Sequence, residues 1–496
     1  MMKKLLVLAA MAVVVLGLAF ALNSLPASES PRVYASSLAG ISGAGETGIN
    51  VQNLDQSMEA QISADFYPQG GGAAKQFTGT AGAGAAYNFW LPGMNLADGA
   101  YAAVVNADRQ IAAIARTDWP SKGGAAIYSN VIPDVEVQLP LVTKEYGDQC
   151  SLISIQNTNT SSQATAVVDF FAAGSADSVL EKEYTIQPGT SITLRICDED
   201  DFITELPANF LGSVVVTSKD NVTKLGVQSF IDISTSDQAV YAFEGVPSDQ
   251  APSELYAPLF RASPKLGTNR LGDTGISVVN TETTPVDVSI TFYPAGGDCD
   301  KAPVSWDHTI PASSSYVFWQ GPIDDNPLKG TNCYGSARIV AANDGKILAI
   351  VNDGVNDYAG GKYNINAAAY NAVSADLGGA KAALPLFRTG HTKFNLWTGI
   401  SCMNVGSAQA DINMSVTNLV DGSVLDNIMS DSVGQYQTAV LWPAKVQATG
   451  APWDGVNTAV GSATINSSQP VVCIVNDSSL SGQYDAATYN GIAISQ

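Results

Sequence analysis

Apolar and polar residues alternate in short stretches along this chain of 496 residues. The clearest alternation lies at 60–67, 164–170, 286–292 and 410–416, where every second residue is apolar. A period of two over about eight residues indicates a strand with one buried face and one face in water. Glycine-rich turns follow most of these stretches, and no amphipathic helix of useful length interrupts them. The pattern therefore predicts an all-β protein.

A six-residue motif that closes on asparagine marks an internal repeat. It occurs four times, at 48–53, 152–157, 275–280 and 399–404, and its closing asparagines are 104, 123 and 124 residues apart. A self-similar period of this size means that one folding unit is repeated along the chain. Seven or so short strands in about 104–124 residues match an immunoglobulin-sized β-sandwich.

Further landmarks keep the same order in each copy. An aromatic corner carries Trp90, Trp319 or Trp442, and the second copy has Arg195 there. We therefore expect four tandem Ig-like β-sandwich domains, at 36–137, 138–252, 253–381 and 382–496. The Cys–Trp–Cys spacing of true immunoglobulin domains is missing, so the prediction concerns architecture alone. The joints look short, apart from a flexible linker expected at 245–253, and short joints predict a semi-rigid rod.

The amino terminus has the pattern of an export signal. Lys3 and Lys4 precede an apolar run at 5–22, and small residues offer cleavage after Ala21 or Ala35. A charged start, an apolar segment and a small-residue site are typical of a secretory signal peptide, so we assign 1–35 to a signal and short spacer. An uncleaved membrane anchor is the alternative, because eighteen apolar residues are long for a signal.

Charge excludes one class of partner. The chain has 24 basic and 46 acidic residues, a formal net charge of −22, and only two histidines. Nucleic-acid binding depends on clusters of Lys and Arg, which are missing here. We expect no nucleic-acid partner, and no membrane contact once the signal is removed.

Six cysteines are distributed two to each of the last three copies: Cys150 and Cys197, Cys299 and Cys333, Cys402 and Cys473. Pairing within a copy is the simplest of fifteen connectivities, because each unit would then close before its neighbour forms. Zinc is the alternative, but no C-x-x-C spacing and no neighbouring histidine supports it. Three disulfides are predicted, in keeping with an oxidising, extracellular location.

Motifs of catalysis are missing from the chain. A G-x-G-x-x-G match at 43–48 precedes a strand and lacks the following helix that dinucleotide binding requires. His308 and His391 lie in different copies, with no nucleophile motif around either. We predict no catalytic residue and no enzymatic activity; a secreted hydrolase is a remote alternative.

Two kinds of binding site remain as candidates. Acidic loops offer oxygen ligands to calcium, although none has the EF-hand spacing, and solvated loops are the alternative. The acidic candidates are Asp198, Asp200, Asp201, Asp324 and Asp325. No other cofactor is expected. The tryptophan corners, with Tyr67 and Tyr293, are candidates for stacking on sugars, and packing between or within domains is the alternative.

Low charge, abundant Gly, Ala, Ser, Thr and Asn, and repetition through the whole mature chain resemble bacterial surface-layer and adhesin-type proteins built of tandem Ig-like repeats. The resemblance implies a non-catalytic extracellular structural protein: a subunit of a surface layer, sheath, fibre or stalk. Its partners would be copies of itself or other cell-surface components. The alternative function is a secreted adhesin that binds glycans or surfaces through its aromatic corners and loops.

Overall fold

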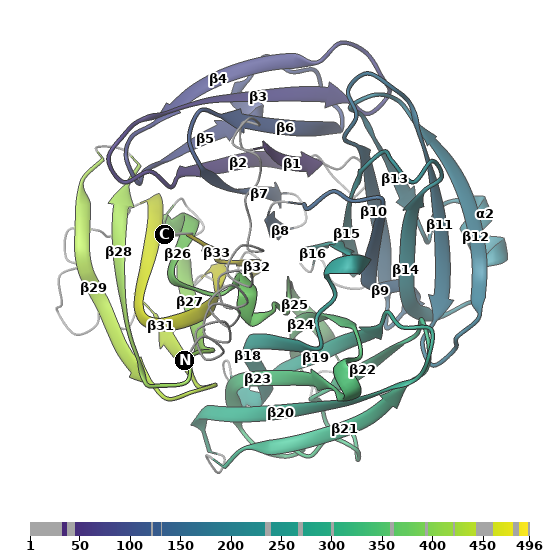
Figure 1. Ribbon diagram of the computed structural model, residues 1–496, viewed down its shortest axis with the longest axis vertical. Helices are drawn as coiled ribbons and strands as arrows, with labels where there is room; N and C mark the ends of the chain where they lie inside the picture. The colour runs from purple at the N-terminus through teal and green to yellow at the C-terminus, as the bar shows by residue number, and fades with distance from the viewer. Residues whose placement is uncertain are drawn as a thin grey trace, which may run out of the picture.

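The computed structural model is an all-β protein in which short connections join β-strands. It describes residues 32–36, 45–120, 123–129, 131–233, 240–265, 271–298, 302–357, 362–391, 395–419, 422–442, 460–479 and 486–494. We call the four sequence-defined segments, with the bounds given above, the first to fourth repeats. Their strands lie in four groups around a common centre (Figure 1).

The first repeat forms two separate four-stranded antiparallel sheets. One has the order β1-β6-β3-β4 and the other the order β5-β2-β7-β8. The bounds are β1 (Arg32–Ser36), β2 (Glu46–Asn53), β3 (Ala60–Pro68), β4 (Lys75–Ala81), β5 (Ala86–Trp90), η1 (Leu91–Gly93), β6 (Tyr101–Ala107), β7 (Ile111–Trp119) and β8 (Gly124–Ser129). Both sheets contribute to a single buried hydrophobic cluster, because their apolar faces turn toward each other.

The second repeat forms a nine-stranded sheet, in which the long first strand pairs with β14 on one side and with β10 on the other. Its elements are β9 (Glu136–Tyr146), β10 (Gln149–Asn157), β11 (Ala164–Ala172), β12 (Ser178–Ile186), β13 (Ser191–Arg195), α2 (Asp200–Glu205), β14 (Phe210–Ser218), β15 (Leu225–Ile233), β16 (Val240–Glu244), β17 (Val246–Pro247) and η2 (Ser248–Gln250). The flexible linker expected at 245–253 is wrong, because β17 pairs with β9 and Ala251 is buried.

The third and fourth repeats form one eight-stranded sheet each. The third has β18 (Glu254–Lys265), β19 (Leu271–Asn280), β20 (Val286–Gly297), β21 (Val304–Ile310), β22 (Ser315–Trp319), β23 (Cys333–Ala341), η3 (Ala342–Asp344), β24 (Ile347–Asp357), β25 (Lys362–Asn371) and η4 (Ala375–Leu377). The fourth has β26 (Gly379–Arg388), β27 (Leu396–Asn404), β28 (Ala410–Asn418), β29 (Val424–Val433), β30 (Thr438–Leu441), β31 (Val460–Ser479), β32 (Ala487–Asn490) and β33 (Ile492–Ala493).

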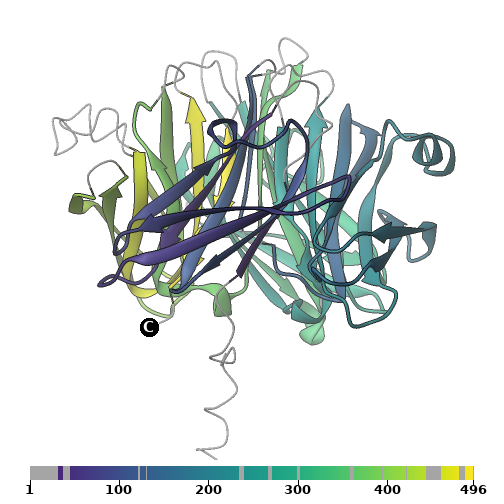
Figure 2. The same ribbon diagram turned by 90° about the horizontal axis from the view of Figure 1, so that it is seen from above.

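The repeats close into a ring. Their last strands, β8, β16, β25 and β32, meet at the centre, where each contacts the next and β32 contacts β8 (Figure 1). Buried alanines such as Ala125, Ala242, Ala368 and Ala487 line these strands, and side chains this small let four strands approach closely. The perpendicular view shows the outer strands of the first repeat crossing the inner ones at an angle (Figure 2).

Each large hydrophobic cluster continues into the neighbouring repeat. The cluster of the second repeat includes Ile350 of the third, and that of the third includes Ile474 of the fourth. The cluster of the fourth repeat includes Ile114 and Ile127 of the first, which closes the ring. The expectation of a semi-rigid rod is therefore wrong: the first and last repeats share a core, and apolar burial favours the closed arrangement.

The closing asparagine of the motif fastens a turn in every repeat. In the third repeat, Asn280 is fully buried and its Nδ2 donates to the carbonyls of Thr284, Ile310 and Pro311 at 2.8–3.1 Å. Its Oδ1 accepts the backbone N–H of Glu282. Asn53, Asn157 and Asn404 repeat this pattern. An amide with both a donor and an acceptor satisfies backbone groups that the turn would leave unpaired.

A glycine followed by serine recurs at 212–213, 335–336 and 461–462, and each of these glycines lies at a bulge. In β23, a Cβ on Gly335 would lie 2.1 Å from the carbonyl oxygen of Tyr293, and Gly212 and Gly461 face the same contact at 2.0 and 2.1 Å. The pairing register shifts beside each of these glycines. Only glycine allows this close backbone approach, which accounts for its recurrence in the sequence.

Two predicted disulfides are confirmed. Cys150 bonds Cys197, and Cys402 bonds Cys473 between the adjacent strands β27 and β31. Cys333 is also disulfide-bonded, while its expected partner Cys299 lies outside the described residues. Disulfides in this number fit an extracellular protein. Among the described residues, no helix has the length and apolarity to cross a membrane.

Of the expected signal and spacer at 1–35, residues 1–31 lie outside the described residues, and 32–35 belong to β1. Ala35 pairs with Ala103 inside this strand, so the expected cleavage after Ala35 would remove most of β1, whereas the expected cleavage after Ala21 would leave the strand intact.

Candidate functional site

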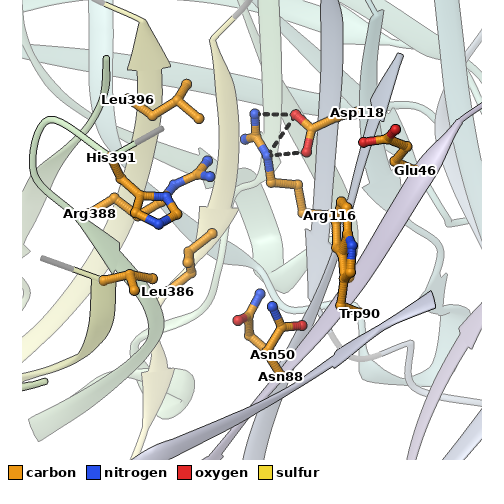
Figure 3. Close-up of a pocket in the computed structure, with 12 residues that line it drawn as sticks. Glu46, Asn50, Asn88, Trp90, Arg116, Asp118, Leu386, Arg388, His391 and Leu396 are labelled. Atoms are coloured by element: carbon orange, nitrogen blue, oxygen red, sulfur yellow. Dashed lines mark hydrogen bonds and ion pairs between the residues drawn. The ribbon is translucent and has the colours of Figure 1, made fainter. Parts of the chain in front are cut away.

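A pocket of about 300 Å³ opens where the fourth repeat meets the first (Figure 3). We call it the seam pocket. The first repeat lines it from β2, β5 and β7 with Glu46, Gly48, Asn50, Asn88, Trp90, Arg116 and Asp118. The fourth repeat lines it mainly from β26 and the segment after it with Leu386, Arg388, His391, Leu396 and Val460. Its volume is at the lower end of the range for small-molecule sites.

Trp90 forms an aromatic wall of the seam pocket. The residue is 40% exposed, and its indole ring lies over Gly48 on the adjacent strand. A Cβ at Gly48 would lie only 3.2 Å from the ring, so glycine makes room for the indole. The same pairing joins Gly275 to Trp319 and Gly399 to Trp442. In the second repeat both members change, to Leu152 and Arg195.

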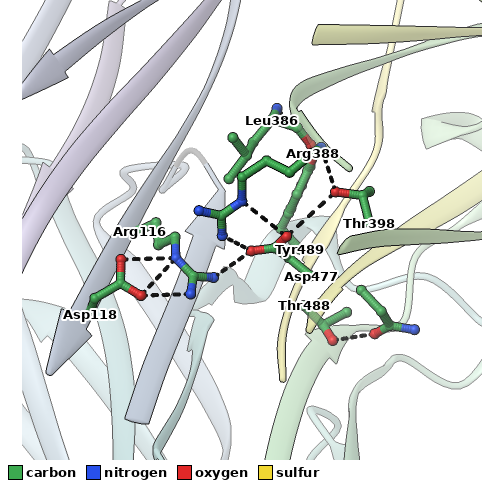
Figure 4. A network of polar contacts seen from close by, with 9 residues as sticks. Arg116, Asp118, Leu386, Arg388, Thr398, Asp477, Thr488 and Tyr489 are labelled. Atoms are coloured by element: carbon green, nitrogen blue, oxygen red, sulfur yellow. Dashed lines mark hydrogen bonds and ion pairs between the residues drawn. The ribbon is translucent and has the colours of Figure 1, made fainter. Parts of the chain in front are cut away.

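A buried network of ion pairs lies next to the seam pocket (Figure 4). Asp477 accepts hydrogen bonds from Arg388 of its own repeat and from Arg116 Nη1 of the first repeat, the latter at 2.7 Å. Arg116 also forms a bidentate pair with Asp118 at 2.6–3.0 Å. Asp477 is fully buried, so an ion pair across the seam replaces the water that it loses.

The two guanidinium groups decide the protonation state of Asp477. Burial by itself favours the neutral carboxyl, but Arg388 and Arg116 together hold the pKa of Asp477 below its ordinary value. Asp353 is the equivalent residue of the third repeat, and its ion pair among the described residues is with Arg261. There burial, with the negative charge of the nearby Asp273, outweighs the one guanidinium, and the pKa of Asp353 is raised.

Two buried polar atoms of residues that line the seam pocket, Asn88 Oδ1 and His391 Nδ1, have no hydrogen-bond partner among the described residues. Burial, and then the nearby Arg388, lower the pKa of His391, so its imidazole is neutral at neutral pH. Arg388 directs its guanidinium toward the pocket (Figure 3). These donors and acceptors, with an aromatic wall, suit a small hydroxylated ligand.

The other three seams lack this set of side chains. At the position of Asn88 they carry Thr193, Val317 and Val440. At the position of Arg116 they carry Phe230, Asn352 and Asn476. In the fourth repeat the buried Trp397 stands in the place of Glu46, where it fills space. The first repeat therefore differs from the others at its seam, and a position-by-position comparison of the four repeats is the sequence signal that reveals it.

The acidic loops predicted for calcium do not converge on one site. Asp198 pairs with Arg195, and Asp324 pairs with Lys329. Asp200 begins the short helix α2, and Asp325 lies in the loop after β22; nothing is described of the Asp201 side chain. Among the described residues, no group of three or more His, Cys, Asp or Glu is arranged to hold a metal ion.

Of the aromatic candidates, some pack between repeats and one lines the seam pocket. Tyr67 packs on Gly189 of the second repeat, and Tyr293 contacts Tyr436 of the fourth, so both tyrosines belong to seams. Trp319 and Trp442 are partly buried. His308 of the third repeat stacks on Tyr316 with ring centroids 3.5 Å apart, whereas His391 belongs to the fourth repeat. Trp90 alone of these candidates lines the seam pocket.

Comparison with protein families found no matching family model, and no curated protein matched. Solved structures gave distant similarities. The crystal structure of Thermotoga maritima 1070 is 19% identical, covering 23% of this chain and 93% of that one, with a TM-score of 0.19. The Anabaena sensory rhodopsin transducer is 14% identical, covering 19% of this chain and 94% of that one, with a TM-score of 0.16.

A serine-rich repeat protein, Srr2, from Streptococcus agalactiae is 11% identical, covering 54% of this chain and 86% of that one, with a TM-score of 0.11. At these identities and TM-scores, none of the similarities indicates a ligand, an activity or a partner for this chain.

Proposed function

We propose that this chain is a non-catalytic extracellular binding protein, in which four Ig-like sandwich units form a rigid ring and the seam pocket binds a saccharide. The observation that carries the proposal is the position of Trp90, which is partly exposed on the wall of the seam pocket. Among the described residues, the other three seams do not have this set of side chains. The apolar face of a sugar ring stacks on an indole.

The polar lining supports the same ligand class. Sugar hydroxyls both donate and accept hydrogen bonds, and the pocket lining includes the amides of Asn50 and Asn88 and the guanidinium group of Arg388. Each guanidinium is already neutralised, Arg116 by Asp118 and Arg388 by Asp477. Glu46 adds a further negative charge, so a neutral sugar is favoured over an acidic one.

A glycan array followed by calorimetry tests this function. We expect saturable binding of the wild-type protein to one group of neutral glycans, and a loss of at least about tenfold in affinity for Trp90→Ala. Trp319→Ala is the matched control, because Trp319 occupies the equivalent corner outside the pocket and its substitution should leave binding unchanged. Binding that survives Trp90→Ala, or no binding to any glycan, would overturn the proposal.

A second candidate function is structural, and the sheet edges favour it. The strands β4, β12, β21 and β29 are the outer ends of their sheets, where backbone groups are available to a neighbouring strand. Such edges would let rings associate into a layer or sheath of cell-surface components. Light scattering across a concentration series, with electron microscopy of the cell envelope, tests this: a protein that stays monomeric and off the envelope is not a structural subunit.

A further inference from the structure

Four oxygen-bearing side chains meet at the centre of the ring. They belong to the last residues of β8, β16, β25 and β32, the strands at the centre of Figure 1: Ser129, Glu244, Asn371 and Asn490. Strand registers place the four residues at equivalent positions in the four repeats. Together they offer one hydroxyl, one carboxyl and two amide oxygens.

Hydrogen bonds connect the four residues in a chain. Ser129 donates its backbone N–H and its hydroxyl, the latter at 2.8 Å, to Glu244 Oε1. Asn371 Nδ2 donates to Glu244 Oε2 at 3.1 Å and to the Glu244 carbonyl at 3.0 Å. Asn490 Nδ2 donates to the carbonyl of Asn371 at 2.7 Å. The polar groups of all four repeats therefore gather around one carboxyl.

This carboxyl has no counter-ion among the described residues. Glu244 is only 7% exposed, and no lysine or arginine of the described part of the chain forms an ion pair with it. The hydrogen bonds from Ser129 and Asn371 favour the ionised carboxylate, whereas burial opposes the charge and raises the pKa of Glu244. Buried carboxylates are usually paired with a cation or coordinate a metal ion.

Two amide oxygens near this carboxyl also need a partner. Asn371 Oδ1 and Asn490 Oδ1 are buried and accept no hydrogen bond within the described ranges. Asn371 is 9% exposed, and its amide contacts Glu244 Oε2 through Nδ2, so its oxygen lies beside the carboxyl. Buried amide oxygens normally have a partner. What this cluster lacks is a positively charged group that binds oxygen.

We propose that these four side chains form a calcium site at the centre of the ring, with Glu244 as its one charged ligand. Calcium is bound by carboxylate, amide and hydroxyl oxygens, and water completes its coordination shell. A site with a single carboxylate belongs with the weak calcium sites of extracellular modules, with dissociation constants of about 10⁻⁴–10⁻³ M. Magnesium requires a smaller and more regular octahedral shell, so it should bind less well.

The calcium site differs from the seam pocket in its residues and in its effect. None of its four side chains lines that pocket. Because the ligands come from all four repeats, a bound ion would hold the ends of the central strands together and stabilise the closed ring. At free calcium ten times the dissociation constant, the folding equilibrium constant should increase by about tenfold.

Calorimetric titration of calcium chloride into the chelator-treated protein tests the site. We expect one ion per wild-type chain, and binding weaker by at least about tenfold in Glu244→Gln, which loses the charged ligand. Asp324→Asn is the control, because it removes an exposed carboxyl of an acidic loop and should bind calcium as wild type does. Equal binding by wild type and Glu244→Gln, or binding lost only in Asp324→Asn, would overturn the proposal.

A second variant changes affinity in the opposite direction. Asn490→Asp adds a second carboxylate at the centre and should bind calcium at least about threefold more tightly. Thermal melting of the wild-type protein should respond to calcium chloride more than to magnesium or sodium chloride at equal ionic strength. If Glu244→Gln fails to fold, the proposal is overturned by wild-type protein that binds no calcium, by Asn490→Asp that binds no more tightly, or by three salts that act alike.

Discussion

Arg116 Nη1 lies 2.7 Å from Asp477 Oδ2, although the two residues are 361 positions apart in the chain. Their ion pair joins β7 of the first repeat to β31 of the fourth and lies beside the seam pocket. Because both side chains are almost fully buried, the contact depends on the closed ring. The same pair therefore reports on ring closure and on the integrity of the proposed binding site.

Removing the charge of Asp477 should destabilise the closed ring. Asp477→Asn leaves Arg116 and Arg388 buried with less compensation, and breaking such a buried pair typically lowers the free energy of unfolding by about 3–5 kcal/mol. Urea denaturation at neutral pH measures this loss. Asp198→Asn removes an exposed partner of Arg195 and should change stability by less than about 1 kcal/mol. Equal effects of the two substitutions would contradict the role of Asp477.

Acid should erase the difference between wild type and Asp477→Asn. The folded-state pKa of Asp477 is lowered, so its contribution is present above the ordinary pKa of an aspartate and is lost as the pH falls through the folded value. Denaturation midpoints measured from neutral pH downward should converge for the two proteins. Curves that diverge at acid pH would refute the assigned charge state.

Gly335 should not tolerate a side chain. Gly335→Ala places a Cβ 2.1 Å from the Tyr293 carbonyl oxygen, and relieving this clash requires a backbone shift at the bulge between β20 and β23. We expect a loss of about 1–3 kcal/mol in stability. Gly70→Ala is the matched control, because its Cβ would meet nothing within 4 Å. Thermal melting of both variants measures this loss. If Gly335→Ala melts at the wild-type temperature, the bulge is not the reason why this glycine recurs.

The closing asparagine should be essential to each turn. Asn280→Ala leaves three carbonyls and the N–H of Glu282 without their partner, at a position that water does not reach. The expected loss is about 1–3 kcal/mol. Asn95→Ala, at an exposed loop asparagine, should lie within about 0.5 kcal/mol of wild type in the same chemical denaturation. Similar midpoints for the two variants would contradict this role.

Reduction should weaken the fourth repeat. The Cys402–Cys473 bond closes a loop of 71 residues, and loop-closure entropy of this size corresponds to about 4 kcal/mol. The thermal midpoint should fall when a reductant is added and in the double variant Cys402→Ala with Cys473→Ala. A midpoint that does not respond to either treatment would show that packing alone holds β27 against β31.

Much of the fold could be predicted from local sequence patterns. The alternation at 60–67 and its counterparts became β3, β11, β20 and β28, because the direction of side chains in a strand depends on neighbouring residues alone. The recurring asparagine and glycine also have local roles: the asparagine bonds the backbone of a turn, and the glycine allows a bulge. The cysteine pairs at 150–197 and 402–473 followed from the repeat, since the two members of each pair lie within one unit.

The site itself was decided by contacts between repeats. The sequence by itself determined an all-β chain of four related segments and two of its disulfides, because these depend on short-range pattern and period. Only the tertiary structure brought Arg116, Asp477 and Trp90 to one seam, and Glu244 to the centre, because apolar clusters that continue from each repeat into the next bend the chain into a ring. Closure of that ring depends on surfaces more than 300 residues apart, and no alternation within a strand encodes which surface meets which.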